Sequence, residues 1–230
     1  MVISRKALIS IGLLVLSSYA LGGVFKDDFE DGDSKGWKEL SGKWIVEEGM
    51  YGLSETPPNP PGFVYTVLQS PWELGDGVLE VDVKFTRNTK GSDVAAILFR
   101  MPDEVSGYIY RMHGKGWFEF GRLVNNSFKY LIGLPIKLSP GKTYTIKILL
   151  EGDIFKVYVN GELFQRMGDP EAKIKKGRIG LGLNTKNILF EEVRVEGEGV
   201  FQFSVGEQVE PVDKMPVTWA TLKNNREGEP

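Results

Sequence analysis

The sequence has no cysteine and only one histidine, His113, in its 230 residues. Without cysteine the chain has no disulfide, no thiol nucleophile and no cysteine-ligated zinc or iron–sulfur site. A single imidazole also excludes any site built from two histidines. These absences remove much of the usual catalytic and metal chemistry, and no cofactor is required by what remains.

Positive charge is not in excess either. The chain carries 28 Lys+Arg against 31 Asp+Glu, for a formal net charge of -3. It therefore has no basic field with which to hold a nucleic-acid backbone or an anionic membrane, and no nucleic-acid partner is expected. With 41% hydrophobic residues, the composition is that of a globular protein.

The first twenty residues differ from the rest of the chain. Arg5 and Lys6 precede an apolar run over residues 7–16, which is too short for a transmembrane helix, and Ser18-Tyr19-Ala20 fits a small-x-small cleavage pattern. Residues 1–20 are therefore predicted to be a signal peptide, with an uncleaved membrane anchor as the alternative. Export would place the protein outside the cell, in a periplasm or on the cell surface.

From Phe25 onward the pattern is that of successive β-strands. Hydrophobic and polar residues alternate with period two over 78–85, 144–148 and 155–159, which predicts strands with one buried face. Asn160-Gly161 between two apolar runs predicts a tight hairpin. No long amphipathic helix is apparent before the C-terminal tail. These signals predict an all-β fold with two antiparallel sheets in a jelly-roll sandwich.

Two segments stand apart from the predicted sandwich. Residues 54–62 contain a Pro-Pro-Asn-Pro-Pro run that cannot donate ladder hydrogen bonds and is predicted to be a loop. Residues 198–230 form a predicted, partly disordered tail. In it Phe201, Phe203 and Val205 alternate like a last strand, and Trp219 could dock on the domain or on a cell-envelope or protein partner.

The order of several motifs resembles a known superfamily. These motifs are Phe25-Lys26-Asp27-Asp28-Phe29-Glu30-Asp31-Gly32, Gly42-Lys43-Trp44, Ala95-Ala96-Ile97-Leu98-Phe99-Arg100, Val157-Tyr158-Val159-Asn160-Gly161, Gly177-Arg178-Ile179-Gly180 and Phe190-Glu191-Glu192-Val193. The chain resembles concanavalin A-like lectin/glucanase domains, including laminin-G-like and 3-keto-disaccharide hydrolase-type modules, over residues 24–197. The resemblance implies a jelly-roll domain but leaves the activity open, because this superfamily includes sugar binders, glycoside hydrolases and protein-binding modules.

Strand alternation in the central region predicts a ligand-binding patch. If Ile97, Phe99, Tyr108, Tyr110, Met112, Phe118 and Phe120 face the core, the opposite face carries Arg100, Arg111, His113, Trp117 and Glu119. Sugars bind to such a mixture, since an indole stacks on the C–H face of a ring while Arg, His and Glu bond its hydroxyls. The alternative is a surface ion-pair cluster with a half-buried tryptophan. A second aromatic rim is possible at Tyr51, Tyr65 and Trp72.

Signs of catalysis are weaker. Glu80-Val81-Asp82-Val83-Lys84 approaches the Glu-x-Asp-x-Glu strand motif of laminarinase-like glycosidases, but Lys84 stands where the second glutamate should be. A solvated strand face explains this alternation better. Gly32-Asp33-Ser34-Lys35-Gly36 matches a nucleophile-elbow pattern only formally, because it lies in a hydrophilic loop. If the protein is an enzyme, Glu119 is the first candidate for a base.

A structural Ca²⁺ is a further expectation. Members of the superfamily often hold this ion between the first and last strands, so the resemblance implies Glu30 and Glu192 as ligands. The same acidic segment fails as an EF-hand, because counting from Asp31 puts Lys35 at the fifth position and Gly42 at the twelfth.

The leading hypothesis is therefore an exported, non-catalytic carbohydrate-binding domain that recognises a polysaccharide or oligosaccharide. A glycoside hydrolase of the 3-keto-disaccharide or laminarinase-like type is the first alternative. An extracellular protein-binding or structural module of the laminin-G type is the second.

Overall fold

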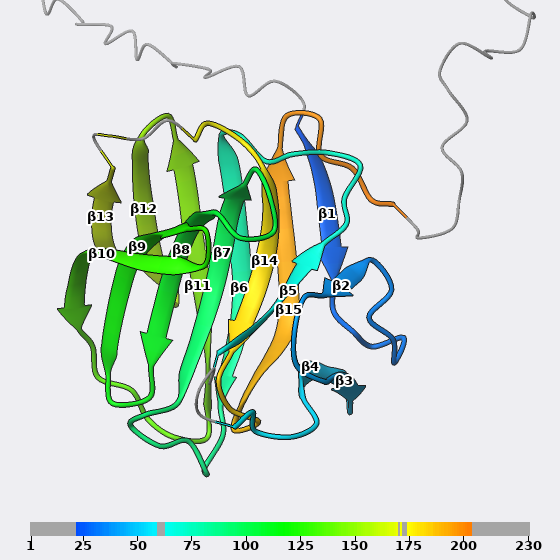
Figure 1. Ribbon diagram of the computed structural model, residues 1–230, viewed down its shortest axis with the longest axis vertical. Helices are drawn as coiled ribbons and strands as arrows, with labels where there is room; N and C mark the ends of the chain where they lie inside the picture. Colours follow the sequence, from blue (N-terminus) through cyan, green and yellow to red (C-terminus); the bar gives the residue numbers. More distant parts are fainter. Residues whose placement is uncertain (1–21, 59–62, 170, 172–173, 204–230) are drawn as a thin grey trace, which may run out of the picture.

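The fold is an antiparallel β-sandwich of two sheets that face each other (Figure 1). The computed structural model describes residues 22–58, 63–169, 171 and 174–203. Within these ranges no helix is present, and so none that could cross a membrane. The predicted signal peptide and the Trp219 segment lie outside the described residues.

Sheet A has eight strands. Its main path runs in the order β13 (Glu162–Gly168), β12 (Ile154–Val159), β11 (Lys142–Glu151), β6 (Gly77–Phe85), β15 (Ile188–Gly197), β4 (Met50–Leu53) and β3 (Trp44–Glu47), and β1 (Gly23–Asp27) pairs with β15. The predicted strands over 78–85, 144–148 and 155–159 all lie in this sheet. Asn160 and Gly161 have φ values of 51° and 85°, so the predicted tight hairpin is confirmed.

Sheet B has seven strands. They run in the order β10 (Ser127–Pro135), β9 (Trp117–Val124), β8 (Gly107–His113), β7 (Val94–Met101), β14 (Arg178–Leu183), β5 (Val64–Leu68) and β2 (Trp37–Glu39). Strands distant in sequence are neighbours at its centre, where β14 pairs with both β7 and β5. The jelly-roll prediction is confirmed by this arrangement.

The main core lies between the two sheets. The predicted inward residues of the central strands belong to it and are buried, namely Ile97, Phe99, Tyr108, Tyr110, Met112, Phe118 and Phe120. Aromatic rings pack in tilted and stacked pairs, such as Phe99 with Phe120 at a centroid distance of 6.2 Å. Period-two alternation therefore assigned this side of sheet B correctly.

The outer face of sheet B is covered by side chains and is not simply exposed to solvent. All eight residues of β7 are buried, although alternate residues point to opposite faces. On the outer side Ala96, Leu98 and Ile109 belong to a second apolar cluster, against which Phe63, Tyr65 and Phe128 pack. The second cluster forms part of the floor of the candidate site.

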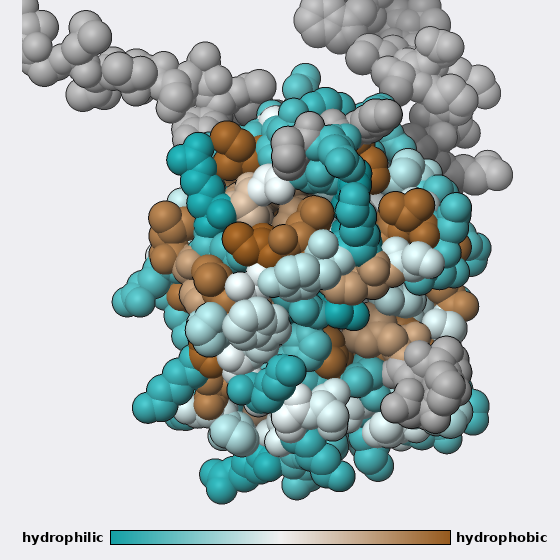
Figure 2. All heavy atoms as spheres, turned by 60° about the vertical axis from the view of Figure 1, so that its left-hand side comes forward, coloured by the Kyte–Doolittle hydropathy of each residue, from teal (hydrophilic) through white to brown (hydrophobic). Residues whose placement is uncertain are grey.

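The edge of the sandwich at β10 and β13 has exposed apolar side chains. Tyr130 on β10 is 51% exposed and Leu163 on β13 is 59% exposed. Figure 2 brings this side of the molecule forward and shows hydrophobic patches separated by hydrophilic side chains. No single continuous apolar surface is visible from this direction.

The described part of the C-terminal tail does not form a strand. Residues 201–203 are irregular, which corrects the prediction that Phe201 and Phe203 begin a last strand; Val205 lies outside the described residues. Instead Phe203 stacks on Phe25 at 5.2 Å, and the Trp72 indole donates to the Phe201 carbonyl at 2.9 Å. The segment is therefore held by one aromatic stack on β1 and by a hydrogen bond to the Phe201 carbonyl, while the Phe201 side chain is 44% exposed.

Candidate functional site

A shallow groove on the outer face of sheet B follows strand β8 and meets a row of residues contributed by the neighbouring strands. Strand register places one row of residues side by side across the sheet, in the order Tyr65, Gly182, Ala96, Arg111, Glu119 and Gly133. Gly182 and Ala96, in the middle of the row, are buried and have little or no side chain, so larger side chains from the flanks can cover them. Neighbouring strands are about 4.8 Å apart, which brings the residues of the row within reach of one another.

Aromatic rings line this groove. Phe63 and Tyr65 lie over Gly182, where an added Cβ would be 2.6 Å from Phe63 Cε1 and 2.9 Å from Tyr65 Cδ1. On the other side, the Arg111 guanidinium carbon lies 3.5 Å from the centroid of the Phe128 ring. The glycine at position 182 is required by this close approach, and the cation–π contact fixes the plane of the guanidinium.

Arg111, His113 and Glu119 form one charged cluster beneath the rings. Arg111 Nε donates to Glu119 Oε1 at 2.7 Å, and a second Arg111 nitrogen pairs with the same oxygen. His113 Nε2 lies 2.8 Å from this Glu119 oxygen. Burial by itself raises the pKa of Glu119, but the bonds from His113 and Arg111 outweigh it and lower the pKa. Glu119 is therefore a buried carboxylate that orients both partners.

Two recesses open on either side of Arg111 and Phe63, which line both. The aromatic recess has a volume of about 640 Å³ and is lined by Phe63, Arg111, Lys38, Glu39, Leu40, Ser41, Tyr65, Glu104, Val105, Asn126 and Phe128. The polar recess, of about 490 Å³, is lined by Phe63, Arg111, Thr56, Pro57, Lys90, Ser92, Asp93, Val94, Asn184, Thr185 and Asn187. One site thus combines stacking surfaces with amide, hydroxyl and charged groups.

Arg100 does not belong to this site, and its predicted outward position is wrong. Between the pairs Leu98–Gly180 and Met101–Arg178, β7 has one residue more than β14. The extra residue forms a bulge in which Arg100 has a φ of 49°, so the alternation of faces breaks there. The Arg100 side chain is fully buried and its guanidinium lies 5.2 Å from the Phe155 ring centroid, on the core side of the sheet.

Arg100 instead ties loops together at one end of the sandwich. Its nitrogens donate to the Gly75 carbonyl at 3.2 Å, the Gly152 carbonyl at 2.7 Å and the Asp76 carboxylate at 2.9 Å. These acceptors belong to the loops before β6 and between β11 and β12. The role of Arg100 is structural.

Trp117 lies at the margin of the site. It pairs with His113 across the hairpin, and its indole lies over Gly133 of β10, where an added Cβ would be 2.7 Å from Nε1. The side chain is half-buried and lines neither recess. The structure therefore brings Arg111, His113, Glu119 and Trp117 together, but among these four residues only Arg111 borders the recesses.

Several lining residues were not predicted from the sequence. Tyr65 was expected at an aromatic rim, but its two companions are core residues, since Tyr51 is fully buried and Trp72 is 6% exposed. Phe63 follows the proline-rich loop and Phe128 follows the β9–β10 turn, positions at which no alternation can assign a face. Asn184 and Asn187 lie in the connection after β14, where turn chemistry was the only available signal.

The motifs considered for catalysis lie elsewhere. Glu80, Asp82 and Lys84 are on the outer face of sheet A, where Lys147, Thr145 and Glu191 bond them at 2.7, 2.6 and 2.9 Å respectively. These side chains are half-buried and paired with one another rather than fully solvated, and burial raises the pKa of Asp82. The segment with Ser34 is an irregular loop, with no helix after it to form a nucleophile elbow.

The residues proposed for calcium, Glu30 and Glu192, line one recess of about 420 Å³ on sheet A. Glu192 pairs with Lys26 at 3.0 Å. Within the described residues, no group of three or more acidic or histidine side chains has the arrangement of a metal site. The calcium expectation stays a prediction.

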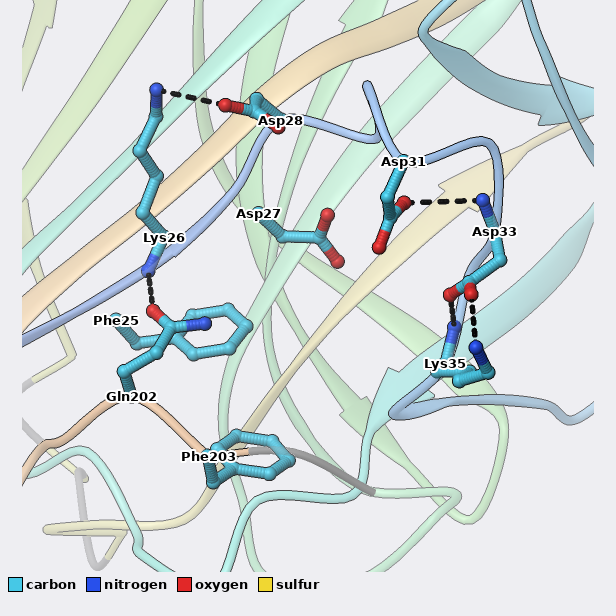
Figure 3. Close-up of a pocket in the computed structure, with 9 residues that line it drawn as sticks. All are labelled: Phe25, Lys26, Asp27, Asp28, Asp31, Asp33, Lys35, Gln202 and Phe203. Atoms are coloured by element: carbon cyan, nitrogen blue, oxygen red, sulfur yellow. Dashed lines mark hydrogen bonds and ion pairs between the residues drawn. The ribbon is translucent and has the colours of Figure 1, made fainter. Parts of the chain in front are cut away.

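A further recess of about 470 Å³ lies beside β1 and is acidic in composition (Figure 3). Its carboxylates are already engaged: Asp28 bonds Lys26 at 3.1 Å, and Asp27 accepts from the Trp37 indole at 2.8 Å. Gln202 Oε1 accepts from the Lys26 backbone N–H at 2.9 Å, and Phe203 lies beside Phe25. These contacts attach the chain after β15 to the edge of β1, and this recess serves the fold.

Comparisons with known proteins agree with the architecture. The sequence model of the 3-keto-alpha-glucoside-1,2-lyase-like domain matches residues 24–196. The carbohydrate-binding module CBM66 from Bacillus subtilis is similar in structure, with a TM-score of 0.55, 21% identity, and coverage of 72% of this chain and 94% of that chain. The β-glucanase of Bacillus licheniformis gives a TM-score of 0.57 at 16% identity, covering 77% and 99%.

The Crh5 transglycosylase in complex with NAG is a third similar structure. Its TM-score is 0.56 at 14% identity, with 78% of this chain and 86% of that chain covered. No curated protein matches the chain at a significant level. Since all identities are below one quarter, these structures show a shared fold.

Proposed function

Because the chain belongs to the family of 3-keto-alpha-glucoside-1,2-lyase-like domains, we propose that it binds a carbohydrate in the groove on the outer face of sheet B. The observation that carries the proposal is the placement of Arg111. Its guanidinium is fixed by the Phe128 ring and the Glu119 carboxylate, and it borders both recesses. The N–H groups of a fixed guanidinium that point outward can donate hydrogen bonds to sugar hydroxyls, and the nearby aromatic rings can pack against the C–H faces of sugar rings.

A glycan-array screen of the purified protein tests this function, with Arg111→Met as the variant. Arg111→Met preserves much of the side-chain length and should reduce glycan binding at least tenfold, while Arg166→Ala on the exposed side of β13 should leave it unchanged. Since Arg111→Met leaves Glu119 without one partner, Phe63→Ala provides a second variant outside the charged cluster. Wild-type protein that binds no glycan would contradict the proposal.

A second candidate function is lyase or hydrolase activity on a 3-keto-glucoside. The observation that favours it is the 2.8 Å contact of His113 with Glu119, because a carboxylate that orients an imidazole is a common arrangement for a general base; His113 lies next to Arg111, which lines both recesses, but lines neither itself. A 3-keto group acidifies the hydrogen on C2. A base that removes this proton lets the electron pair form a C1–C2 double bond as the glycosidic C1–O bond breaks, and the leaving oxygen takes up a proton.

Hydrolysis by a pair of carboxylates is less well supported. Such enzymes need a proton donor, whereas the lowered pKa of Glu119 keeps this group ionised near neutral pH. Product release from 3-keto-disaccharides and β-glucans distinguishes these possibilities. Turnover that is lost in both His113→Gln and Glu119→Gln would favour the enzyme, and absence of turnover in the wild type would favour the binding domain.

Export and calcium binding are parts of the same proposal. N-terminal sequencing of secreted protein should begin near residue 21, and material that begins at Met1 would contradict cleavage. A calcium ion at Glu30 and Glu192 would raise the melting temperature, and a chelator would lower it. Equal melting temperatures with Ca²⁺ and with chelator would contradict the calcium prediction.

A further inference from the structure

We infer that the ligand is an uncharged oligosaccharide that lies along the groove, crosses Arg111 and places sugar rings in both recesses. This inference rests on the proposed carbohydrate-binding function and adds the size, orientation and charge of the ligand. It follows from three features of the site: its length, the different chemistry of its two recesses, and its balance of charge.

The length comes from strand geometry. The polar recess begins at Val94, which pairs with His113 at the end of β8, whereas the aromatic recess extends to Val105, just before β8 begins at Gly107. Six residue steps along β8 correspond to about 20 Å. A single sugar ring is much shorter than this. Since Phe63 and Arg111 line both recesses, a chain of rings can continue from one recess to the other.

The polar recess presents fixed hydrogen-bonding groups. Asn184 accepts from the Val94 backbone N–H at 2.7 Å, and Asn187 donates to Asp93 at 3.1 Å. These bonds hold the side chains in place. Among the described residues, the second carboxylate oxygen of Asp93 and the amide oxygen of Asn187 make no hydrogen bond, so both can accept from sugar hydroxyls.

The aromatic recess has a different character. Phe63 and Tyr65 pack with their ring centroids 4.8 Å apart, and Leu40 and Val105 add apolar surface. Such a surface favours the C–H face of a sugar ring rather than its hydroxyls. The two recesses therefore suit different parts of a carbohydrate chain, and a ligand in only one of them loses the contacts of the other.

The charges of the groove are balanced. Basic side chains lining the recesses are Lys38, Lys90 and Arg111, and acidic ones are Glu39, Asp93 and Glu104. Lys38 pairs with Glu104 at 2.6 Å, and Arg111 pairs with Glu119. With equal numbers of basic and acidic side chains, the groove gives a carboxylate or sulfate on the sugar no net attraction to repay its desolvation.

Calorimetric titration with oligosaccharide ladders tests the inference. The probes are malto-, laminari-, cello- and fructo-oligosaccharides from one to six units, with oligogalacturonides of the same lengths as the charged set. An uncharged ladder should show affinity that rises by at least about tenfold from the monosaccharide to the longer members and then levels off. Oligogalacturonides should bind at least about tenfold more weakly than uncharged oligomers of equal length.

Variants in each recess locate the ligand. Tyr65→Ala in the aromatic recess and Asp93→Asn in the polar recess should each weaken binding of the longest oligomer by about tenfold, whereas a monosaccharide should be affected by one of them at most. Arg166→Ala is the control. If Tyr65→Ala is poorly folded, Leu40→Ser takes its place, because Leu40 lines the same recess.

Three outcomes would overturn the inference. A monosaccharide that binds as tightly as the hexamer would show a single-ring site. Charged oligomers that bind as well as uncharged ones would contradict the charge argument. Binding that neither recess variant changes would place the ligand elsewhere. Failure of every glycan to bind the wild type would instead remove the proposed function itself, so the two failures are distinguishable.

Discussion

Replacement of Arg100 is the sharpest test of how the central strands are assigned. The sequence pattern places Arg100 on the ligand-binding face, whereas the bulge in β7 turns it to the core side, where its side chain is fully buried. Arg100→Ala should therefore destabilise the fold and leave carbohydrate affinity per folded molecule unchanged.

The magnitude follows from the contacts. The guanidinium donates to the carbonyls of Gly75 and Gly152 and to the Asp76 carboxylate, at distances between 2.7 and 3.2 Å. Hydrogen bonds from a charged group contribute about 1.5 to 3 kcal/mol each when buried, but Asp76 and the loop carbonyls can regain water once the arginine is gone. We therefore expect a loss of about 3 to 5 kcal/mol, because truncation also leaves a cavity where the fully buried side chain packs near the Phe155 ring.

Thermal unfolding followed by circular dichroism measures this loss. At about 2 to 4 °C per kcal/mol for a domain of this size, the melting temperature should fall by about 6 to 20 °C. Arg100→Lys should restore only part of the lost melting temperature, because a single ammonium group cannot reach acceptors on both loops. The exposed Arg166→Ala should change stability by no more than about 0.5 kcal/mol. A loss below about 1 kcal/mol for Arg100→Ala, or normal stability with lost glycan binding, would refute the reasoning.

Three other predictions follow from single contacts. The lowered pKa of Glu119 means that its ionised form stabilises the fold above the ordinary glutamate pKa, and that this contribution disappears as the pH falls through the lowered value. The difference in unfolding free energy between wild type and Glu119→Gln should therefore shrink from pH 7 to pH 3. A constant difference would contradict this prediction. Gly133→Ala places a Cβ 2.7 Å from the Trp117 indole nitrogen. It should lower the free energy of unfolding by about 1 to 3 kcal/mol and shift the tryptophan fluorescence. Unchanged fluorescence and stability would refute the contact. Phe203→Ala removes the stack on Phe25 and should lower the free energy of unfolding by about 1 kcal/mol. In the same melting assay Phe201→Ala should change it very little, because the Phe201 side chain is 44% exposed. Equal effects of the two substitutions would mean that the stack is unimportant.

The sequence by itself determined the all-β class and most of the buried face of each strand. Period-two alternation is a direct consequence of backbone geometry, because successive side chains point to opposite sides whatever the partner strand is. It therefore placed Phe99, Tyr110 and Phe118 in the core correctly, and on the outer face it grouped Arg111 with Glu119. The tight turn at Asn160-Gly161 was equally local, since these residues tolerate positive φ.

Only the tertiary structure decided where that alternation fails and which distant residues complete the groove. The bulge that buries Arg100 depends on the pairing of β7 with β14, about eighty positions later in the chain, so no local pattern reports it. Phe63, Phe128 and Asn187 reach the groove from loops and strand ends whose directions are set by packing. Local geometry fixes which side of a strand a residue faces, but register and loop direction depend on hydrogen bonds and contacts between segments far apart in sequence.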